Sequence, residues 1–336
     1  MKTEHISIRR LFILALLIVS CMILNGCGAK KQQKVYKVGI LSGLDYMAGA
    51  ADGFKAKMTK LGYIEGKNIV YDHQKTEFDL AAYNRILKKF VADKVDLIFV
   101  FPTEASLEAK AAAKEAGIPV VFAVANIEDT GLVDSVREPG GNITGVRYPG
   151  PDLAIKRFEI MRELAPNAKR LWIPYQRGYP IVKSQLRALQ PAAESSGITL
   201  IEFPADNAAE VQAELSARAA SGNIGFDAIF FVAEPLAVTP DIFEVMGKFA
   251  AEHKLPIGGA YMMVNGYGSI FGVNIETVAT GKQAALLADK ILKGTPAGTI
   301  PVVSSESFFQ IDYNVANELG VKVPEGLLSR ADEIIR

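Results

Sequence analysis

The stretch VDLIFVF, residues 95–101, gives the clearest indication of the fold in this chain of 336 residues. Only Asp96 interrupts its apolar side chains, so the run lacks the polar–apolar alternation of a strand with one face in water. Such a run is typical of a strand that is buried on both faces. The runs IPVVFAV (118–124) and DAIFFVA (227–233) have the same character. The sequence therefore predicts parallel sheets with helices on both faces.

Helical patterns flank the stretch 95–101 on both sides. Upstream, Asp79 is placed to cap a helix that runs to Ala92. The apolar stripe of this helix consists of Leu80, Tyr83, Ile86, Leu87 and Phe90. Downstream, a helix from Glu104 to Ala116 ends at Gly117, a residue type that commonly terminates helices.

The same alternation continues along the chain and restarts near residue 150. Further strands are expected at residues 35–41, 68–74, 142–148, 170–176, 198–204, 255–260 and 268–274. Further helices are expected at residues 46–61, 151–164 and 275–292, between Pro180 and Gly197, after an Asn207–Glu210 capping box, and after Thr239–Pro240. The predicted fold class is α/β, with two doubly wound parallel-sheet lobes joined by a multi-strand hinge.

The expected domain organisation follows from this restart and from the short segment at the end of the chain. That segment is too small to fold alone, so we expect it to cross back and complete both lobes. The first lobe is assigned residues 35–147 and 273–305. The second lobe is assigned residues 148–272 and 306–336.

The first 34 residues have the pattern of a targeting segment. Basic residues, including Arg9 and Arg10, precede an apolar run from Leu11 to Leu24, which is short for a membrane-spanning helix. Leu24-Asn25-Gly26-Cys27 looks like a lipobox, which predicts a lipoprotein signal peptide over residues 1–27, lipidation at Cys27 and a linker over 28–34. The alternatives are a chance cysteine at an ordinary signal-peptide end and a signal anchor. We expect an extracytoplasmic protein tethered to a membrane through Cys27.

Composition and motifs argue against several classes of function. The chain has 37 Lys and Arg residues and 37 Asp and Glu residues, whereas nucleic-acid binders usually carry a basic excess. The sequence contains no GxSxG nucleophile elbow, no HExxH zinc motif and no complete phosphate loop. After signal cleavage its only histidines are His73 and His253. We therefore expect a protein that is not an enzyme and needs no metal or cofactor.

The loops that follow the predicted strands are the expected place for a ligand, because open parallel sheets bind ligands beyond their carboxyl ends. Polar and aromatic residues gather in these loops, as in a small-molecule site. The candidate ligand-binding residues are Ser42, Tyr46, Thr103, Ser106, Asn126, Glu128, Tyr148, Tyr175, Arg177, Glu234 and Tyr261. For each of them the alternative is a structural role, as a helix cap, a packed surface tyrosine or a solvated loop charge.

Specific roles are expected for six of these residues. Thr103 and Ser106, at the start of a helix, would hold an anionic end of the ligand. Glu234 or Glu128 would meet a cationic end. Two tyrosines, Tyr148 and Tyr175, would form walls. Asp45 and Glu104 are further strand-end charges, for which a solvated role is the alternative.

Several segments resemble a known family. These are LGYIEGKNI (61–69), VADKVDLIFV (91–100), GIPVVFAV (117–124), GLVDSVREPGGNITGV (131–146), DKILKGTPAGTIPV (289–302) and LGVKVPEGLLSRADEII (319–335). They are similar to the substrate-binding lipoproteins of ABC importers, in the branch that includes binders of tryptophan and related aromatic amino acids. The resemblance implies a type I periplasmic-binding-protein fold with a three-strand hinge, and a receptor that delivers its ligand to a membrane permease.

The sequence departs from this family in the loops that contact ligands. These loops read FPTEAS (101–106), NIED (126–129) and AEP (233–235), where the family often has Thr-Pro with small residues, Thr-Asp-Pro and Thr-Asp-Asn. We expect a monomer that closes on a small ligand, an amino acid or a related carboxylate. The alternatives are a sensor that presents its ligand to a membrane kinase or chemoreceptor, and an extracytoplasmic enzyme.

Overall fold

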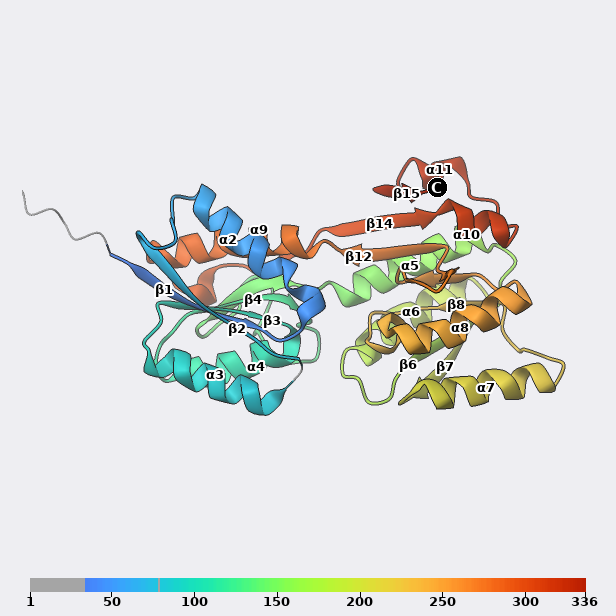
Figure 1. Cartoon of the computed structure of the whole chain (residues 1–336), viewed down its shortest axis with the longest axis horizontal. Coiled ribbons are helices and arrows are strands. Elements are labelled where there is room, and N and C mark those ends of the chain that lie inside the picture. Colours follow the sequence, from blue (N-terminus) through green and yellow to red (C-terminus); the bar gives the residue numbers. More distant parts are fainter. Residues whose placement is uncertain (1–33, 78) are drawn as a thin grey trace, which may run out of the picture.

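A computed structural model describes residues 34–77 and 79–336 and has two α/β lobes (Figure 1). The predicted signal peptide, Cys27 and most of the linker lie outside the described residues. Within the described part of the chain, no helix combines the length and the apolar character that crossing a membrane requires.

The first lobe is built on a sheet of six parallel strands in the order β13-β5-β4-β3-β1-β2. Its strands are β1 (Tyr36–Ser42), β2 (Ile69–Lys75), β3 (Leu97–Phe101), β4 (Val120–Ala125), β5 (Ile143–Arg147) and β13 (Val303–Ser304). The predicted strand at 95–101 is confirmed as β3, which lies between β1 and β4 with all five residues buried. It starts two residues late, because the Asp96 carboxylate accepts a hydrogen bond from the N–H of Lys37 at 2.8 Å.

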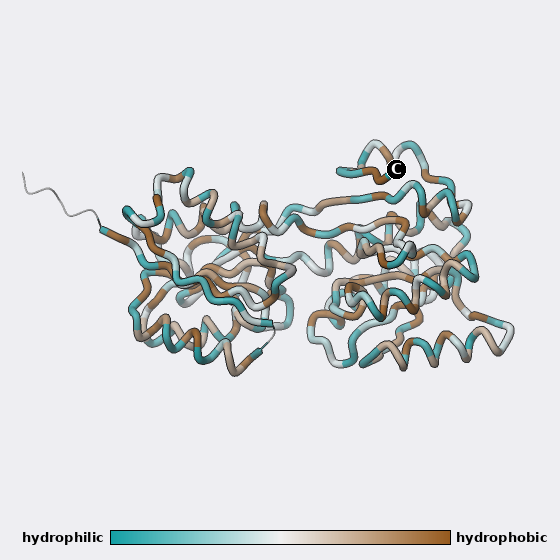
Figure 2. Tube along the Cα trace, in the orientation of Figure 1, coloured by the Kyte–Doolittle hydropathy of each residue, from teal (hydrophilic) through white to brown (hydrophobic). Residues whose placement is uncertain are grey.

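Helices cover both faces of this sheet, as predicted. One face carries α2 (Gly49–Lys60) and α9 (Thr277–Leu292), and the other carries α3 (Leu80–Ala92) and α4 (Thr103–Lys114). Two short 3-10 turns, η1 (Asp45–Met47) and η3 (Ala297–Thr299), complete the lobe. Figure 2 shows that the inner strands are largely hydrophobic, whereas the helices carry polar residues as well.

The second lobe has a seven-stranded sheet in the order β15-β14-β12-β9-β8-β6-β7, in which only the β12–β14 pair is antiparallel. Its strands are β6 (Arg170–Gln176), β7 (Thr199–Ala205), β8 (Ala228–Phe230), β9 (Ile257–Gly259), β12 (Phe271–Ile275), β14 (Ser307–Asp312) and β15 (Glu333–Ile335). One face is covered by α5 (Gly150–Leu164) and α6 (Val182–Ser195), and the other by α7 (Ala208–Ala220) and α8 (Pro240–His253). The short helices α10 (Tyr313–Glu318) and α11 (Glu325–Leu328) and the turn η2 (Leu236–Val238) complete it.

A hairpin in the second lobe was missed from the sequence. Residues expected to form a loop after β9 contain a hairpin of β10 (Met263–Val264) and β11 (Tyr267–Gly268). Its two turn residues, Asn265 and Gly266, both have positive φ angles, 49° and 85°. Asn-Gly is the residue pair that favours such a tight turn, and this was the available signal.

The helix starts predicted from Asp79, Asn207 and Thr239 are correct in position but not in every hydrogen bond. Asp79 and Asn207 cap α3 and α7 by accepting from the N–H groups of Ala82 and Glu210, both at 3.0 Å. The return bond of the predicted capping box is absent, because Glu210 accepts from the N–H of Asp206 instead. Thr239 precedes α8, but its hydroxyl donates to the carbonyl oxygen of Pro235.

The chain passes between the lobes three times, after β5, after β12 and after β13 (Figure 1). The expected boundary at residue 273 falls inside β12, which pairs along its whole length with β14 in the second sheet. Residues 273–275 therefore lie in the second sheet, and the return to the first lobe begins with α9.

The contact between α2 and α9 is unusually close, because glycines face each other's helix backbone. A Cβ atom on Gly53 would lie 2.0 Å from the carbonyl oxygen of Val278, and one on Gly281 would lie 2.0 Å from that of Ala50. Side chains at these positions would push the helices apart.

Replacing Gly53 with alanine is expected to lower the free energy of unfolding by about 2–3 kcal/mol, because the added methyl group overpacks a backbone contact. Urea denaturation followed by circular dichroism measures this change. Gly326→Ala is the matched control, since no atom lies within 4 Å of a Cβ at that helical position. Equal stability of the two variants would contradict the close-packing argument.

Candidate functional site

The carboxyl ends of the parallel strands in each sheet point toward the other lobe. In the first sheet this follows from β5, whose carboxyl end leads directly into the second lobe. In the second sheet it follows from β12, whose carboxyl end leads back to α9. Because parallel strands share one direction, the loops that directly follow these strands begin at the edges where the lobes face each other.

A groove of about 1020 Å³ lies elsewhere, at the opposite end of the second lobe. Its lining includes Ala168, Asp227 and Pro256, which precede β6, β8 and β9. These are the amino ends of the strands. The strand-end rule therefore favours the facing edges over this groove as the ligand site.

The hydroxyl groups at the first-lobe edge have different environments. Ser42, at the end of β1, is 1% exposed, and its Oγ has no hydrogen-bond partner. Thr103 Oγ1 accepts from the N–H of Asn126 at 3.0 Å. Ser106 is fully buried and its Oγ donates to the carbonyl oxygen of Pro102 at 2.6 Å. The Ser106 hydroxyl is thus bonded to the backbone at the start of its own helix, whereas the Ser42 hydroxyl has no partner.

Glu104 lies in the first turn of α4, next to Thr103, and is half-buried. Burial raises the pKa of its carboxyl group, and only its own backbone N–H opposes the rise. Its Oε2 is buried without a hydrogen-bond partner. The sequence identified Glu104 only as a charged residue at a strand end, for which exposure to solvent was the alternative. Its burial, seen only in the structure, distinguishes it from solvent-exposed loop charges.

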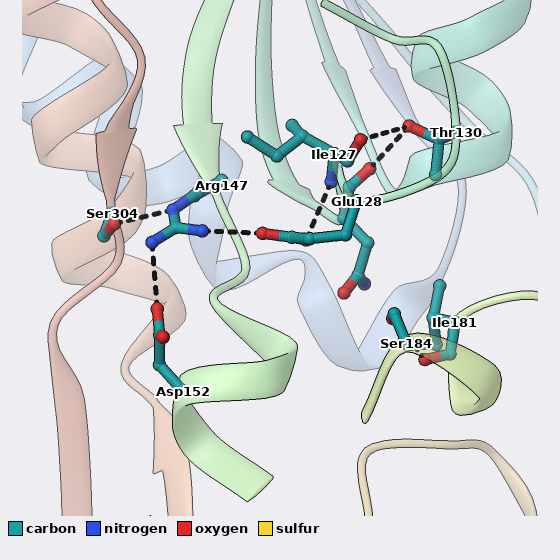
Figure 3. A network of polar contacts seen from close by, with 9 residues as sticks. Ile127, Glu128, Thr130, Arg147, Asp152, Ile181, Ser184 and Ser304 are labelled. Atoms are coloured by element: carbon teal, nitrogen blue, oxygen red, sulfur yellow. Dashed lines mark hydrogen bonds and ion pairs between the residues drawn. The ribbon is translucent and has the colours of Figure 1, made fainter. Parts of the chain in front are cut away.

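The loop after β4 carries Asn126 and Glu128. Asn126 is 3% exposed and its Oδ1 has no partner. A Cβ on Gly150, the first residue of α5, would lie 2.7 Å from this oxygen, so Asn126 faces the second lobe. In Figure 3 the same loop lies opposite Ile181 and Ser184, at the start of α6.

Glu128 is neutralised by an arginine of its own lobe. Its Oε1 lies 2.6 Å from Nη1 of Arg147, which also contacts Asp152 at 2.9 Å and donates to Ser304 Oγ at 2.9 Å (Figure 3). The Arg147 guanidinium thus joins the loop after β4, helix α5 of the second lobe and strand β13. Through this guanidinium, Glu128 takes part in the connection between the lobes.

The next residue, Asp129, connects the lobes directly. Asp129 lies 2.8 Å from Arg187 of α6. Both side chains are more than half exposed, so this ion pair contributes little stability.

Glu234, after β8, is 8% exposed and accepts three hydrogen bonds from backbone N–H groups. The donors are Gln176 at 2.9 Å, Leu236 at 2.7 Å and Ala237 at 2.5 Å. Burial raises the pKa of Glu234 to about 7, and the N–H donors limit the rise. Its carboxyl group therefore organises the second-lobe loop.

Tyr175 and Arg177 are engaged on the surface of the second lobe. The Tyr175 hydroxyl donates to Glu202 at 3.0 Å. Arg177 forms ion pairs with Asp206 at 3.0 Å and Glu210 at 2.9 Å.

The structure separates Tyr261 from the loops discussed above. Its hydroxyl donates to Asp312 at 3.1 Å, and Asp312 also caps α10. The side chain of Tyr46 lies outside the described part of the structure.

Tyr148 lies at the first crossing and packs against the cores of both lobes. Its hydroxyl accepts from Nη2 of Arg157 at 3.3 Å. Arg157 is 1% exposed and also donates to the carbonyl oxygen of Val273, at 2.9 Å from Nε and 2.7 Å from Nη2. Sequence reasoning missed Arg157, although it interrupts the buried stripe of α5 four residues after Leu153 and four before Met161.

Among residues 34–77 and 79–336, no group of three or more His, Cys, Asp or Glu side chains is arranged to hold a metal ion. The unpaired groups of the facing edges are oxygens suited to hydrogen bonds with a small molecule.

Comparison with known proteins agrees with this geometry. A curated protein named tyrosine-binding protein, from Clostridioides difficile strain R20291, is 29% identical over 276 residues, which cover 82% of this chain and 77% of the relative. A conserved domain protein from Vibrio cholerae has a crystal structure with a TM-score of 0.75 and 26% identity, covering 90% of this chain and 100% of that one.

A second crystal structure is that of an ABC domain from Streptococcus pneumonia in complex with L-Trp. It has a TM-score of 0.76 and 24% identity, and covers 90% of this chain and 100% of that one. These likenesses confirm the predicted periplasmic-binding-protein fold.

The family model for ABC transporter substrate binding proteins matches residues 37–335. Members of this family bind solutes outside the cytoplasm and are not enzymes, as the sequence predicted. This chain belongs to the ABC transporter substrate-binding protein family.

Proposed function

We propose that this protein is the lipid-anchored receptor of an ABC importer and binds an aromatic amino acid between its two lobes. The observation that carries this proposal is the 29% identity over 276 residues with a tyrosine-binding protein. The unpaired oxygens of Ser42, Glu104 and Asn126 support the location, because buried polar atoms normally have partners.

Binding would bring the facing edges together by hinge motion about the three crossings. A ligand that contacts both lobes stabilises the closed arrangement by its higher affinity for that state. Asn126 is well placed to respond to closure, since it lies against the first residue of α5 in the other lobe.

A thermal-shift assay on the purified full-length protein tests the ligand class. L-tyrosine or L-tryptophan at 100 times its dissociation constant should add about 2.7 kcal/mol to the free energy of unfolding and raise the midpoint. Myo-inositol is the control. A shift with myo-inositol and none with either amino acid would assign the protein to sugar uptake instead.

The proposed lipid anchor is tested by fractionating cells that produce Cys27 variants. Cys27→Ala is expected to release the protein from the membrane fraction and to abolish its labelling by palmitate, because the acceptor thiol is lost. Cys21→Ala should leave both unchanged, since this cysteine lies in the part removed by cleavage. Identical behaviour of the two variants would argue against lipidation at Cys27.

The role of Glu234 in shaping its loop predicts a pH dependence of stability. The folded pKa, about 7, lies above the ordinary value of 4.5, so the folded state holds its proton more tightly than the unfolded state. The contribution of Glu234 to stability should therefore fall as pH rises from 4.5 toward 7, by up to about 3 kcal/mol at about 1.4 kcal/mol per unit.

The Glu234→Gln variant lacks this titration but keeps a side chain of similar shape. The free energy of unfolding is measured in urea at several pH values for the variant and the wild type. The variant should become more stable relative to the wild type as pH rises over the same interval. Hydrogen bonds lost in the variant add only a constant offset. A difference that stays constant between pH 4 and 8 would show that folding does not raise the pKa of Glu234.

A further inference from the structure

The first-lobe edge contains three unpaired oxygens, at or just beyond the ends of three neighbouring strands. Ser42 ends β1 and pairs in register with Phe101, the last residue of β3. Glu104 follows Phe101 by three residues, and Asn126 follows the end of β4, the other neighbour of β3. The hydrogen bond between Thr103 Oγ1 and the N–H of Asn126, 3.0 Å long, joins the last two segments.

Two of the three side chains are almost completely buried. Ser42 is 1% exposed and Asn126 is 3% exposed, yet Ser42 Oγ and Asn126 Oδ1 have no partner. A buried polar atom without a partner is unfavourable, so a bound group that supplies the missing hydrogen bonds is favoured. Both atoms lie at the edge that faces the second lobe.

The chemistry of these atoms identifies the group that they would bind. A carboxylate and an amide oxygen only accept hydrogen bonds, and a serine hydroxyl both donates and accepts. An anion placed here would be repelled by Glu104 and would find few donors. An ammonium group supplies three N–H donors and a positive charge that would neutralise Glu104.

None of the cations in the described residues forms an ion pair with Glu104, in contrast to Glu128, which Arg147 neutralises. Its half-buried carboxylate therefore loses contact with water without receiving a compensating charge. Glu104 shares its acidic surroundings with Glu77 and Asp79, since burial and all three carboxyl groups raise the pKa of the Tyr83 hydroxyl. A ligand cation would supply the positive charge that is missing here.

We propose that Glu104, Asn126 and Ser42 form a subsite for a positively charged nitrogen of the ligand. For an amino acid this nitrogen is the α-ammonium group. The inference rests on the proposed solute-binding function. It adds which end of the ligand, the positively charged one, binds to the first lobe. It reverses the expectation from the sequence, in which Thr103 and Ser106 hold the ligand's anionic end, because Ser106 already donates to Pro102.

Titration calorimetry on the purified full-length protein tests this subsite with L-tyrosine, tyramine and 3-(4-hydroxyphenyl)propanoate, which lacks the amine. Glu104→Gln removes the charge and keeps the shape. It is expected to weaken binding of L-tyrosine at least tenfold and to change binding of the propanoate less than twofold. Glu108→Gln, one turn further along α4, is the matched control and should leave both affinities within twofold.

Ser42→Ala provides a second variant that is expected to fold, since it removes an unpaired buried hydroxyl. It should weaken L-tyrosine binding about threefold or more. The subsite is disproved if Glu104→Gln binds L-tyrosine within twofold of wild type, or if it weakens L-tyrosine and the propanoate equally. Loss through Ser42→Ala with no change in thermal midpoint supports it.

Failure of the proposed function is distinguishable from failure of the subsite. If the wild type binds tyramine or another amine through Glu104 but no aromatic amino acid, the subsite stands and the aromatic ligand class falls. If the wild type binds only compounds without a basic nitrogen, the subsite falls and a solute-binding role remains.

Discussion

The close approach of α2 and α9 is the contact on which the two-lobed arrangement depends. A parallel sheet is stable only when helices cover both of its faces. In the first lobe, one of the two helices on one face is α9, which follows β12 of the second sheet in the chain. Gly53 and Gly281 let this late helix reach the backbone of α2, so the glycines hold the returning chain in the first lobe.

Two arginines connect the three crossings that this return creates. Arg147, at the first crossing, contacts Ser304 at the third. Arg157 contacts Tyr148 at the first crossing and Val273 at the second. A buried cation is expensive unless its donors are satisfied. The carbonyl oxygens of Val273, in β12, and Phe231, just after β8, accept three of the hydrogen bonds of Arg157. The crossings are therefore linked to one another by directional hydrogen bonds as well as by chain connectivity.

Part of the candidate site was predictable because parallel strands place their following loops at one edge. That rule places the segments of Ser42, Thr103 and Asn126 at the edge of the first lobe that faces the second lobe. It did not show which side chains are already used. Glu128, Arg177 and Glu234 are all charged loop residues, and only the structure shows that the first two are ion-paired and the third is bound by backbone N–H groups.

The sequence by itself determined the fold class, because runs such as residues 95–101 and 227–233 can be buried only as strands covered on both faces. It also determined most element positions, since Asp79 and Asn207 cap helices through local hydrogen bonds. The tertiary structure alone decided the polarity of the first-lobe edge. Whether Ser42, Glu104 or Asn126 keeps a free oxygen depends on groups far away in sequence, and local patterns contain no information about such partners.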